Sequence, residues 1–375
     1  MYFIEERNKK IFKDFDMALF LPVLILAIFG IFILRSATLV RASSGLRMVF
    51  TQGACLVIGV IMAIIISCFD YREITILVNI AYIASSILLL AVLILGRGDQ
   101  YGSRSWIKIA GFSLQPAEFA KVTFVLMISD YLAKLKEKSV VNIKDLFFLG
   151  IYTAIPILLV IIQKDFGTTC VFLAIFFVLL FVYGLNLKYI AEIVGASIAM
   201  MPLAWFFLLN EKRKDRIRVF LNPELDPLGS GLNVLRSKMT IGSGRLFGKG
   251  LFKGIQTQNS AVPVNESDFI FSVIGEETGF IVSVLIVIIF LYIILRAIHI
   301  AKSSDDTYGK FLSMGFVAMI GVHFIENVSM TIGLLPVTGI PLPFISQGGS
   351  SMLANFMAIG FLLSVAKSKK ISSKE

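Results

Sequence analysis

Residues 262–271 read VPVNESDFIF, and within these ten letters the chain passes from a polar segment into one of its most apolar stretches without a linker. Glu266, Ser267 and Asp268 stand directly before the apolar run. If a membrane helix begins here, two carboxylates lie at the lip of the bilayer. Polar residues in that position either cap the helix or take part in chemistry.

The composition of the whole chain predicts a membrane helix at this point and many more like it. Of 375 residues, 57% are apolar and only 16% are charged, and the mean hydropathy is +0.85. Soluble domains carry about 25% charged residues. A spanning helix needs roughly 20 mostly apolar residues, because lipid offers the backbone no hydrogen-bond partner. The sequence therefore predicts an all-α integral membrane protein.

Ten segments are long and apolar enough to be transmembrane helices. They are predicted at residues 17–35, 48–69, 74–95, 116–133, 146–163, 167–184, 188–209, 269–296, 310–331 and 345–366. An even number places both termini on one side, and Lys and Arg in short loops mark the cytoplasmic side. The terminal side carries 17 Lys and Arg, against seven in the short segments of the other side. Both termini are therefore predicted to be cytoplasmic.

One long extracellular loop, residues 210–268, separates the seventh and eighth predicted helices. Its ten Lys and Arg do not oppose this orientation, because loops of about 60 residues translocate largely regardless of charge. The sequence leaves no room for a separate soluble domain. We expect residues 1–375 to form a single membrane domain with this loop as its only large extramembrane part.

Five glycines alternate with basic residues in the loop stretch GSGRLFGKGLFKG, residues 242–254. Arg245, Lys249 and Lys253, together with bare backbone N–H groups, suit an oxyanion such as phosphate. Contact with acidic lipid head groups explains the same composition equally well. The preceding GLNVLRSKMTI, residues 231–241, is predicted to be an amphipathic helix on the membrane surface.

Charged residues inside predicted spans are informative, because each costs a few kcal/mol at the bilayer centre and persists mainly when paired or functional. Glu118 and Lys121 lie three residues apart in the fourth span, so they share a helix face and are predicted to pair. The alternative is an interfacial pair with Lys121 snorkelling to the surface. His323 and Glu326 have the same spacing in the ninth span and are predicted to pair with each other.

Two more polar groups lie near helix ends. Lys164 and Asp165 occupy a tight outer turn, QKDFGTT, where turn chemistry explains them as well as function does. Glu276 and Glu277 stand about two turns into the eighth span. Adjacent helical positions point about 100° apart, so at most one of the two faces any single partner.

Metal sites and histidine-based catalysis are not indicated. The three cysteines lie in apolar segments without paired spacing, and the two histidines are far apart. Any chemistry must therefore rest on carboxylates and basic side chains.

A broken, re-entrant segment is predicted before the tenth helix. The stretch GLLPVTGIPLPFISQGGSSMLANF, residues 333–356, contains three prolines and several glycines, so a continuous helix cannot pass through it. Irregular backbone at membrane depth is tolerated only where protein or a water-filled cavity covers it. Such segments are typical of binding and catalytic sites.

Four segments together resemble the SEDS family of cell-wall polymerases (shape, elongation, division and sporulation). They are GSRSWIKIAGFSLQPAEFAK, QKDFGTT, NESDFIFSVIGEETGF and MTIGLLPVTGIPLPFISQGGSSMLANFMAIGFLLSV. The resemblance covers nearly the whole chain, and the number of spans, their orientation and the long outer loop also agree. The ending SSMLANFMAIGFLLSV looks closer to the RodA branch than to the FtsW branch.

The resemblance implies peptidoglycan glycosyl transfer at the outer face of the membrane. Lipid II, a disaccharide-peptide on undecaprenyl pyrophosphate, would be joined to a growing glycan strand. The resemblance places an essential carboxylate on Asp268 and a buried ion pair on Glu118 and Lys121. Because such a transfer inverts the anomeric centre, a base must take the acceptor proton while the pyrophosphate departs. A helix N-terminus favours an ionised carboxylate, so Asp268 suits the base.

Further polar residues on the outer side are candidates for binding the pyrophosphate or the sugars. They are Arg104, Lys121, Arg213, Arg216, Arg245, Asp165, Ser350 and Ser351. No cofactor is required, although Glu266 and Asp268 beside a pyrophosphate could attract Mg²⁺ or Mn²⁺. The chain departs from the family at Val264, Glu266 and Gln347, where members usually have Glu, His and Tyr.

The resemblance also implies partners and a location. The expected partners are lipid II, a class B penicillin-binding protein, the elongation machinery and membrane lipids, with no nucleic acid. The expected location is the bacterial cytoplasmic (inner) membrane, with a role in cell-wall elongation and cell shape. Three alternatives stay open: a lipid II flippase, a division or sporulation polymerase like FtsW or SpoVE, and a scaffold that recruits a transpeptidase. Charged residues crowd the outer side, which favours an outward-facing enzyme over a flippase.

Overall fold

The computed structural model describes residues 15–98, 104–109, 112–138, 140, 142–186 and 230–372, with residues 188, 192, 195, 214 and 218 in between. Most of these residues are helical. The helices are α2 (Met17–Ala37), η1 (Leu39–Arg41), α3 (Ala42–Cys68), α4 (Thr75–Leu95), α5 (Pro116–Glu137), α6 (Ile143–Ile162), α7 (Phe166–Tyr183), α11 (Ser230–Ser243), α12 (Ile255–Gln258), α13 (Ile270–Ser303), α14 (Thr307–Thr331) and α15 (Gly349–Ser372). The strands are β1 (Arg97–Gly98), β2 (Arg104–Ile109) and β3 (Phe112–Leu114).

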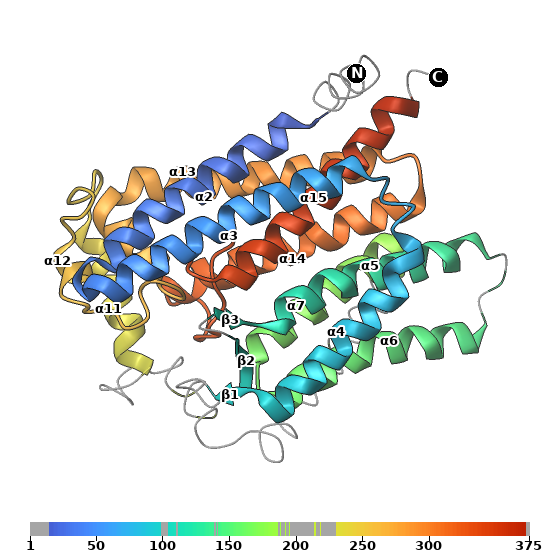
Figure 1. Ribbon diagram of the computed structural model, residues 1–375, viewed down its shortest axis with the longest axis horizontal. Coiled ribbons are helices and arrows are strands. Elements are labelled where there is room, and N and C mark those ends of the chain that lie inside the picture. The colour runs from blue at the N-terminus through green and yellow to red at the C-terminus, as the bar shows by residue number, and fades with distance from the viewer. Residues whose placement is uncertain are drawn as a thin grey trace.

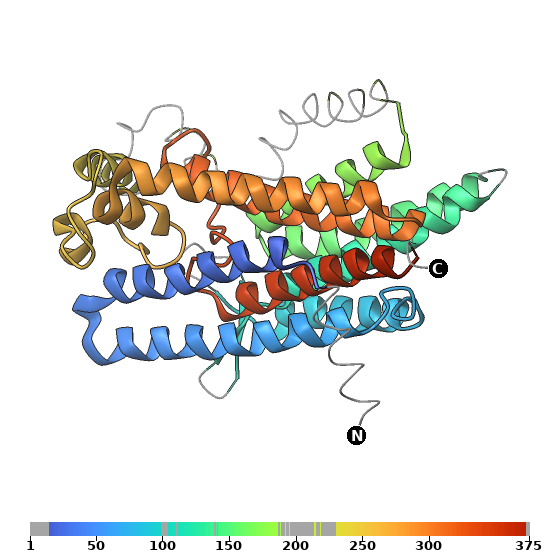
Figure 2. The ribbon, with the colours of Figure 1, turned by 90° about the horizontal axis from the view of Figure 1, so that it is seen from above.

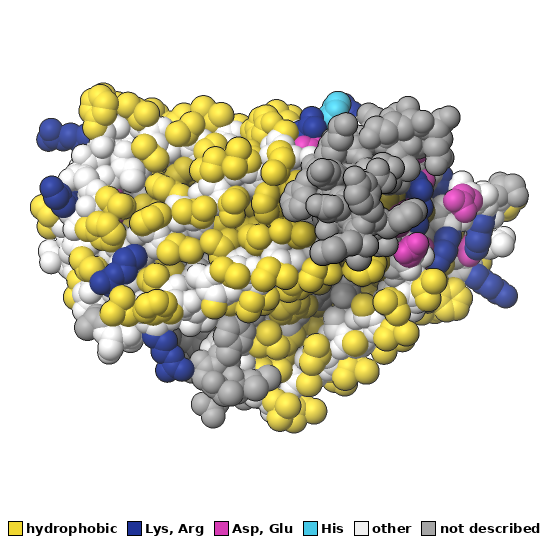
Figure 3. All heavy atoms as spheres, turned by 45° about the horizontal axis from the view of Figure 1, so that its top comes forward, with side chains coloured by type: hydrophobic (Ala, Val, Ile, Leu, Met, Phe, Trp, Pro, Cys, Tyr) yellow, Lys and Arg dark blue, Asp and Glu magenta, His cyan; other side chains and the backbone are white. Residues whose placement is uncertain are grey.

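The described helices have the surface of a multi-pass membrane protein. Eight of them are long and apolar enough to cross a bilayer. Apolar side chains cover much of the side of the bundle, whereas Lys and Arg side chains lie mainly toward its two ends (Figure 3). The predicted all-α membrane class is therefore confirmed. The predicted span 188–209 lies outside the described residues apart from three isolated positions, so the count of ten stays a prediction.

Helix α5 corresponds to the fourth predicted span but is too polar to count among the eight. Its surroundings explain how a polar helix is accommodated. It packs against α4, α6, α7, α14 and α15, and most of its side chains are buried. Protein rather than lipid therefore surrounds Glu118 and Lys121.

The long helices lie side by side along the long axis of the molecule (Figures 1 and 2). Helix α3 packs along α15, α13 along α14, and α14 along α7. Helices α11 and α12 cover one end, against α13 and the last turns of α2, while α2 begins and α15 ends toward the other end (Figure 1). This arrangement agrees with termini on one side of the membrane; which side that is stays a prediction.

Local signals explain several helix boundaries. Pro116 opens α5, where its missing N–H group has no helical partner to lose. Asn142 and Asp145 form a capping box at the start of α6, and Asp165 caps α7 by accepting a hydrogen bond from the Thr168 N–H group. Polar side chains therefore stand at the N-termini of both α6 and α7.

Two features depart from or refine the sequence expectations. The strands form a small antiparallel sheet in the order β1–β2–β3, in a connection between two predicted spans for which no strands were predicted. The segment 332–348 is non-helical as predicted, and α15 begins at Gly349 rather than at residue 345. Protein covers this segment: Phe344 and Ile345 are buried, and a Cβ at Gly30 of α2 would come within 2.6 Å of the Ile345 Cα.

Candidate active site

Asp268 lies two residues before α13, facing the broken segment 332–348. Its side chain is half-buried, and the Ser267 hydroxyl donates to Oδ1 at 2.9 Å. A Cβ at Gly339 would lie 3.5 Å from Oδ2. The N-cap of α13 is Phe269, and no side chain caps this helix. Ser267 does not cap it either, because its hydroxyl is turned toward Asp268.

Three consecutive backbone carbonyls around Asp268 are each held by a different partner. The carbonyl of Glu266 accepts from the Gln347 N–H group at 3.0 Å, and that of Ser267 accepts from the Ser346 hydroxyl at 2.6 Å. The carbonyl of Asp268 accepts from the Asn327 side-chain amide at 2.9 Å. The broken segment and α14 thus fix the backbone that carries the carboxylate.

The loop before Asp268 also contains backbone strain. Val264 has a φ of 55°, a left-handed conformation that β-branched residues rarely adopt. Such a residue costs on the order of 1–3 kcal/mol and persists only where the surroundings hold it. Its carbonyl accepts hydrogen bonds from the amides of Ser267 and Phe269, which closes a tight turn. The position of Asp268 therefore depends on restraints outside the turn.

A buried polar network lies between α5, α14 and α15. Lys121 donates to Glu118 at 2.8 Å and to Nε2 of His323 at 2.5 Å. The other ring nitrogen of His323 contacts the Met319 carbonyl at 2.5 Å, and because a carbonyl only accepts, that nitrogen carries the proton. Nε2 then accepts from the ammonium of Lys121. The predicted Glu118–Lys121 pair is present, in the interior rather than at an interface.

Polar contacts bring the N-termini of α5, α7 and α15 together. The Gln115 N–H group donates to the Ser350 hydroxyl at 3.0 Å, and the Gln115 side-chain amide donates to Asp165 at 3.4 Å. The Ser351 hydroxyl hydrogen-bonds Glu118. Burial raises the pKa of Asp165, although the hydrogen bond from the Thr168 N–H group acts in the opposite direction. Asp165, Ser350 and Ser351 thus join the same region as the buried ion pair.

The broken segment links this region to Asp268. A Cβ at Gly167, in the first turn of α7, would come within 3.0 Å of the Thr338 carbonyl oxygen and side-chain atoms of Ile340. The Asn327 amide donates both to the Ile340 carbonyl at 2.8 Å and to the Asp268 carbonyl. The N-termini of α5, α7, α13 and α15 therefore gather around residues 332–348.

Glu276 and Glu277 tie the segment between α11 and α13 to α13. Both side chains are almost fully buried. Glu276 accepts from Lys249 Nζ at 2.7 Å and from the Thr257 N–H group at 2.8 Å, and Glu277 accepts from the Ser36 hydroxyl at 2.6 Å. As expected from their spacing, the two acids face different partners. Their arrangement is that of anchors for the loop.

The glycine-rich loop, residues 242–254, allows its backbone to approach the backbone of α13 closely. A Cβ at Gly244 would lie 1.9 Å from the Gly275 carbonyl oxygen, and one at Gly248 would lie 2.2 Å from that of Glu277. The N–H groups of Lys249 and Gly250 donate to carbonyls of α13. These amides are therefore engaged within the protein, which corrects the expectation that they are bare and available to an oxyanion.

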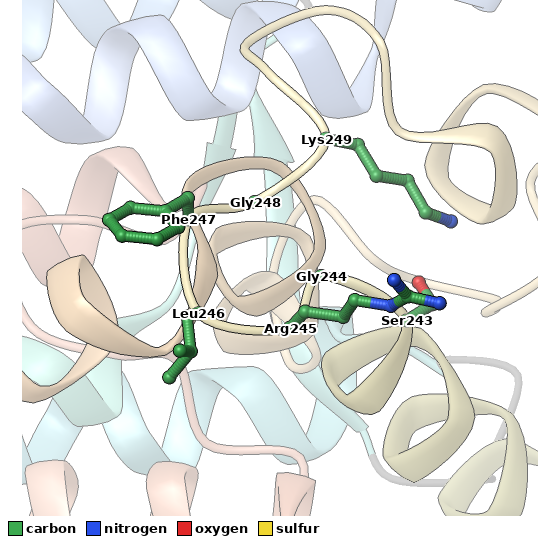
Figure 4. A pocket seen from close by; sticks show the side chains of 7 residues that line it. All are labelled: Ser243, Gly244, Arg245, Leu246, Phe247, Gly248 and Lys249. Carbon is green, nitrogen blue, oxygen red and sulfur yellow. The ribbon is translucent and has the colours of Figure 1, made fainter.

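An open pocket of about 640 Å³ is lined by residues 243–249. Figure 4 shows the side chains of Ser243, Arg245 and Lys249 on one side of the loop and that of Phe247 on the other. The Lys249 ammonium is paired with Glu276, whereas the Arg245 side chain is exposed. Arg245 is therefore the basic side chain that this pocket offers to a ligand.

Comparison with known proteins identifies the family. Residues 16–371 match the family model FTSW_RODA_SPOVE, described as "Cell cycle protein". The chain belongs to this family. It is similar to the probable peptidoglycan glycosyltransferase FtsW of Trichlorobacter lovleyi, with 33% identity over 96% of this chain and 95% of that protein. It is also similar to the peptidoglycan glycosyltransferase MrdB of Escherichia coli K12, with 30% identity over 98% of each.

A solved structure supports the fold directly. It concerns the structural coordination of polymerization and crosslinking by a peptidoglycan synthase complex, and one of its chains matches with a TM-score of 0.81. The identity is 26%, and the match covers 95% of this chain and 98% of that chain. The predicted SEDS membership is confirmed. The choice of the RodA branch stays a prediction, because relatives with FtsW and MrdB names both match.

Four other residues were predicted to bind the pyrophosphate or the sugars, and the structure describes only some of them. Arg213 and Arg216 lie outside the described residues. Arg104 begins β2, and its side chain is outside the described part of the chain. Lys121 is described fully, but at 1% exposure it is enclosed by Glu118 and His323, away from any surface where a phosphate could lie.

The sequence predicted one wrong side-chain pair, and two functional residues were not predicted at all. His323 and Glu326 do not pair; His323 contacts Lys121 instead, because α5 packs against α14. Asn327 was missed, although an amide inside an apolar span was a usable signal. Arg41 was counted only as a loop charge, but it binds both carboxylate oxygens of Glu266. Glu266 is therefore engaged and does not offer a second open carboxylate to a cation beside Asp268.

Proposed function

We propose that this protein is a peptidoglycan glycosyltransferase that polymerises lipid II at the outer face of the bacterial cytoplasmic membrane, with Asp268 as the general base. The observation that carries the proposal is the half-buried carboxylate of Asp268 at the mouth of α13, on a backbone held at three successive carbonyls. The names of the curated relatives support the reaction class.

In the proposed reaction, Asp268 takes the proton of the acceptor hydroxyl as its oxygen attacks the anomeric carbon of the donor sugar. The bond from that carbon to the pyrophosphate oxygen breaks on the opposite face, so the configuration inverts. A base in this position contributes roughly 10²- to 10⁴-fold to the rate. The restrained backbone of residues 266–268 sets how closely the Asp268 carboxylate approaches the acceptor hydroxyl.

The leaving pyrophosphate needs positive charge or donors near it. The four helix N-termini around residues 332–348 supply positive partial charge, which favours anions. Arg245 is an exposed cation in the outer loop, and we keep Arg104, Arg213 and Arg216 as further candidates. We assign the Glu118–Lys121 pair a structural role beneath this site, because both side chains are enclosed.

The proposal includes a partner and a setting. The solved relative belongs to a complex that coordinates polymerization and crosslinking. By analogy, we propose that a class B penicillin-binding protein cross-links the strands made here, within the elongation machinery. We also propose that residues 1–375 act as one membrane domain.

The test is polymerisation by the purified protein in vesicles containing lipid II, with and without the penicillin-binding protein. Asp268→Asn is expected to lower the rate by roughly 10²-fold or more, while Asp305→Asn, at an exposed acid in the α13–α14 connection, should match the wild type. Equal polymer from wild type and Asp268→Asn would contradict the catalytic assignment. Lipid II that crosses the bilayer without polymer formation would support a flippase instead.

A further inference from the structure

An ion pair joins the connection between α2 and α3 to the loop that carries Asp268. Arg41, the last residue of η1, contacts Glu266 through Nη1 and Oε1 at 2.5 Å and through Nη2 and Oε2 at 3.0 Å. The pair is therefore bidentate, an arrangement that fixes orientation as well as distance. The Glu266 side chain is 10% exposed and that of Arg41 is 35% exposed.

The backbone at the arginine end of this pair is held by hydrogen bonds. The Arg41 N–H group donates to the Thr38 carbonyl at 3.1 Å, and the Ser44 hydroxyl donates to the Arg41 carbonyl at 2.8 Å. Thr38 is itself bonded to the Leu34 carbonyl through its amide and its hydroxyl. The guanidinium is thus presented from a tight turn that is hydrogen-bonded on both sides.

The glutamate end lies in the strained turn. Glu266 is two residues after Val264, whose φ is 55°, and two residues before Asp268. The broken segment and α14 hold the backbone of this turn at residues 266–268. Arg41 holds its side chain from the α2–α3 connection, so the turn is restrained by two separate parts of the fold.

We propose that Arg41 is a positioning residue that acts on Asp268 through Glu266. Without the guanidinium, the Glu266 carboxylate is left partly buried and unpaired, so it turns toward water and draws the strained turn with it. A catalytic group must be held within about 0.5 Å of its productive position, and a displacement of about 1 Å can cost roughly 10²-fold in rate. This inference rests on the proposed role of Asp268.

The experiment measures kcat and KM for lipid II polymerisation by monodisperse protein in vesicles. Arg41→Gln and Glu266→Gln are each expected to lower kcat by about tenfold to a hundredfold, with KM changed by less than about threefold. Arg41→Lys keeps the charge but loses the bidentate geometry, so its kcat should lie between those of wild type and Arg41→Gln. The reversed pair, Arg41→Glu with Glu266→Arg, should recover kcat relative to either single reversal.

The controls separate positioning from folding. Lys138→Gln breaks an ion pair of similar length, Lys138–Asp145 at 2.6 Å, at the connection between α5 and α6, and should leave kcat unchanged. Thermal unfolding of each variant reports whether its loss of activity follows loss of fold. A general structural role would lower Tm and kcat together, whereas a positioning role lowers kcat in protein that is still folded at the assay temperature. Unchanged kcat in both neutralising variants, or a reversed pair no better than the single reversals, would overturn the inference.

The outcomes also distinguish this inference from the proposed function. If Asp268→Asn is inactive while Arg41→Gln and Glu266→Gln keep wild-type kcat, the positioning role fails and the catalytic role stands. If Asp268→Asn is fully active, the catalytic role fails and the positioning role fails with it.

Discussion

At the scale of single residues, Lys121 illustrates how a membrane protein encloses a charge. Its side chain is 1% exposed, and its contacts to Glu118 and His323 use an acidic and a neutral acceptor. Desolvation of such a pair is costly, so the pair itself contributes little net stability. Loss of one partner is different, because it leaves the other charge buried alone.

Lys121→Met is therefore expected to destabilise the fold by about 3–5 kcal/mol, because the Glu118 carboxylate loses its partner. The double variant Lys121→Met with Glu118→Gln removes both charges and should recover much of that loss. Lys134→Met breaks the Lys134–Asp130 pair at the exposed end of the same helix, where Lys134 is 64% exposed, and should cost less than about 1 kcal/mol. Thermal unfolding in detergent gives the comparison. Equal losses at Lys121 and Lys134 would refute the argument.

Residue chemistry also limits what the sequence could predict about the site. Spacing on one helix was sufficient for Glu118 and Lys121, because a separation of three residues places both on the same face. The same reasoning failed for His323 and Glu326, since a neighbouring helix offered His323 a different partner. Arg41 and Glu266 are 225 positions apart, so no local spacing could reveal their contact.

At the scale of elements, the junction between the glycine-rich loop and α13 depends on glycine. Helix α13 is kinked at Gly279, which has a φ of 78° and a ψ of −176°. The amides after the kink, those of Phe280 and Ile281, donate to carbonyls of Arg245 and Leu246 instead of to their own helix. The carbonyls of the glycine-rich loop thus accept the hydrogen bonds that these amides would otherwise make within α13.

Gly279→Ala is expected to destabilise the protein by at least about 2 kcal/mol, since a φ of 78° with a ψ of −176° is open essentially only to glycine. That conformation costs a residue with a Cβ on the order of 1–3 kcal/mol. The added Cβ would also lie 2.2 Å from the Gly248 nitrogen. Gly242→Ala is the matched control: a Cβ there meets nothing within 4 Å, and alanine favours the helix α11 by up to about 1 kcal/mol. The two variants should move Tm in opposite directions. A Tm for Gly279→Ala at or above that of Gly242→Ala would contradict the proposed junction.

The elements themselves were largely predictable. Apolar segments of sufficient length located the described spans to within a few residues at most ends, and GLNVLRSKMTI formed the predicted helix as α11. Prolines and glycines located the broken segment. The hairpin of β2 and β3 was missed, because these strands are short and alternate polar with apolar residues beside two long helices. The glycine-rich loop was predicted to offer free amides to an oxyanion, but these amides bond to carbonyls of α13. Composition alone does not reveal which backbone a glycine will approach.

At the scale of the whole molecule, the candidate site is assembled from four helix N-termini and one broken segment. Each part carries a local signal in the sequence, such as a proline, an N-terminal carboxylate or a pair of serines. Their convergence is a property of packing: Asn327, Gln115 and Gly167 join parts of the chain that the sequence leaves unrelated. The sequence therefore supplied the parts of the site and the structure supplied their arrangement.

The orientation of the whole molecule in the membrane decides whether Asp268 can meet an outer substrate, and it can be tested with cysteine labelling. The distribution of Lys and Arg predicts that α11, α12 and the glycine-rich loop lie outside and that the α13–α14 connection lies in the cytoplasm. In a variant with Cys55, Cys68 and Cys170 replaced by alanine, Phe247→Cys, at a position 80% exposed in the outer loop, should react with a membrane-impermeant maleimide in intact cells. Asp305→Cys, at an exposed position of the α13–α14 connection, should react only after permeabilisation. The reverse pattern would place Asp268 on the cytoplasmic side, and an extracellular glycosyl transfer at this residue would then be impossible.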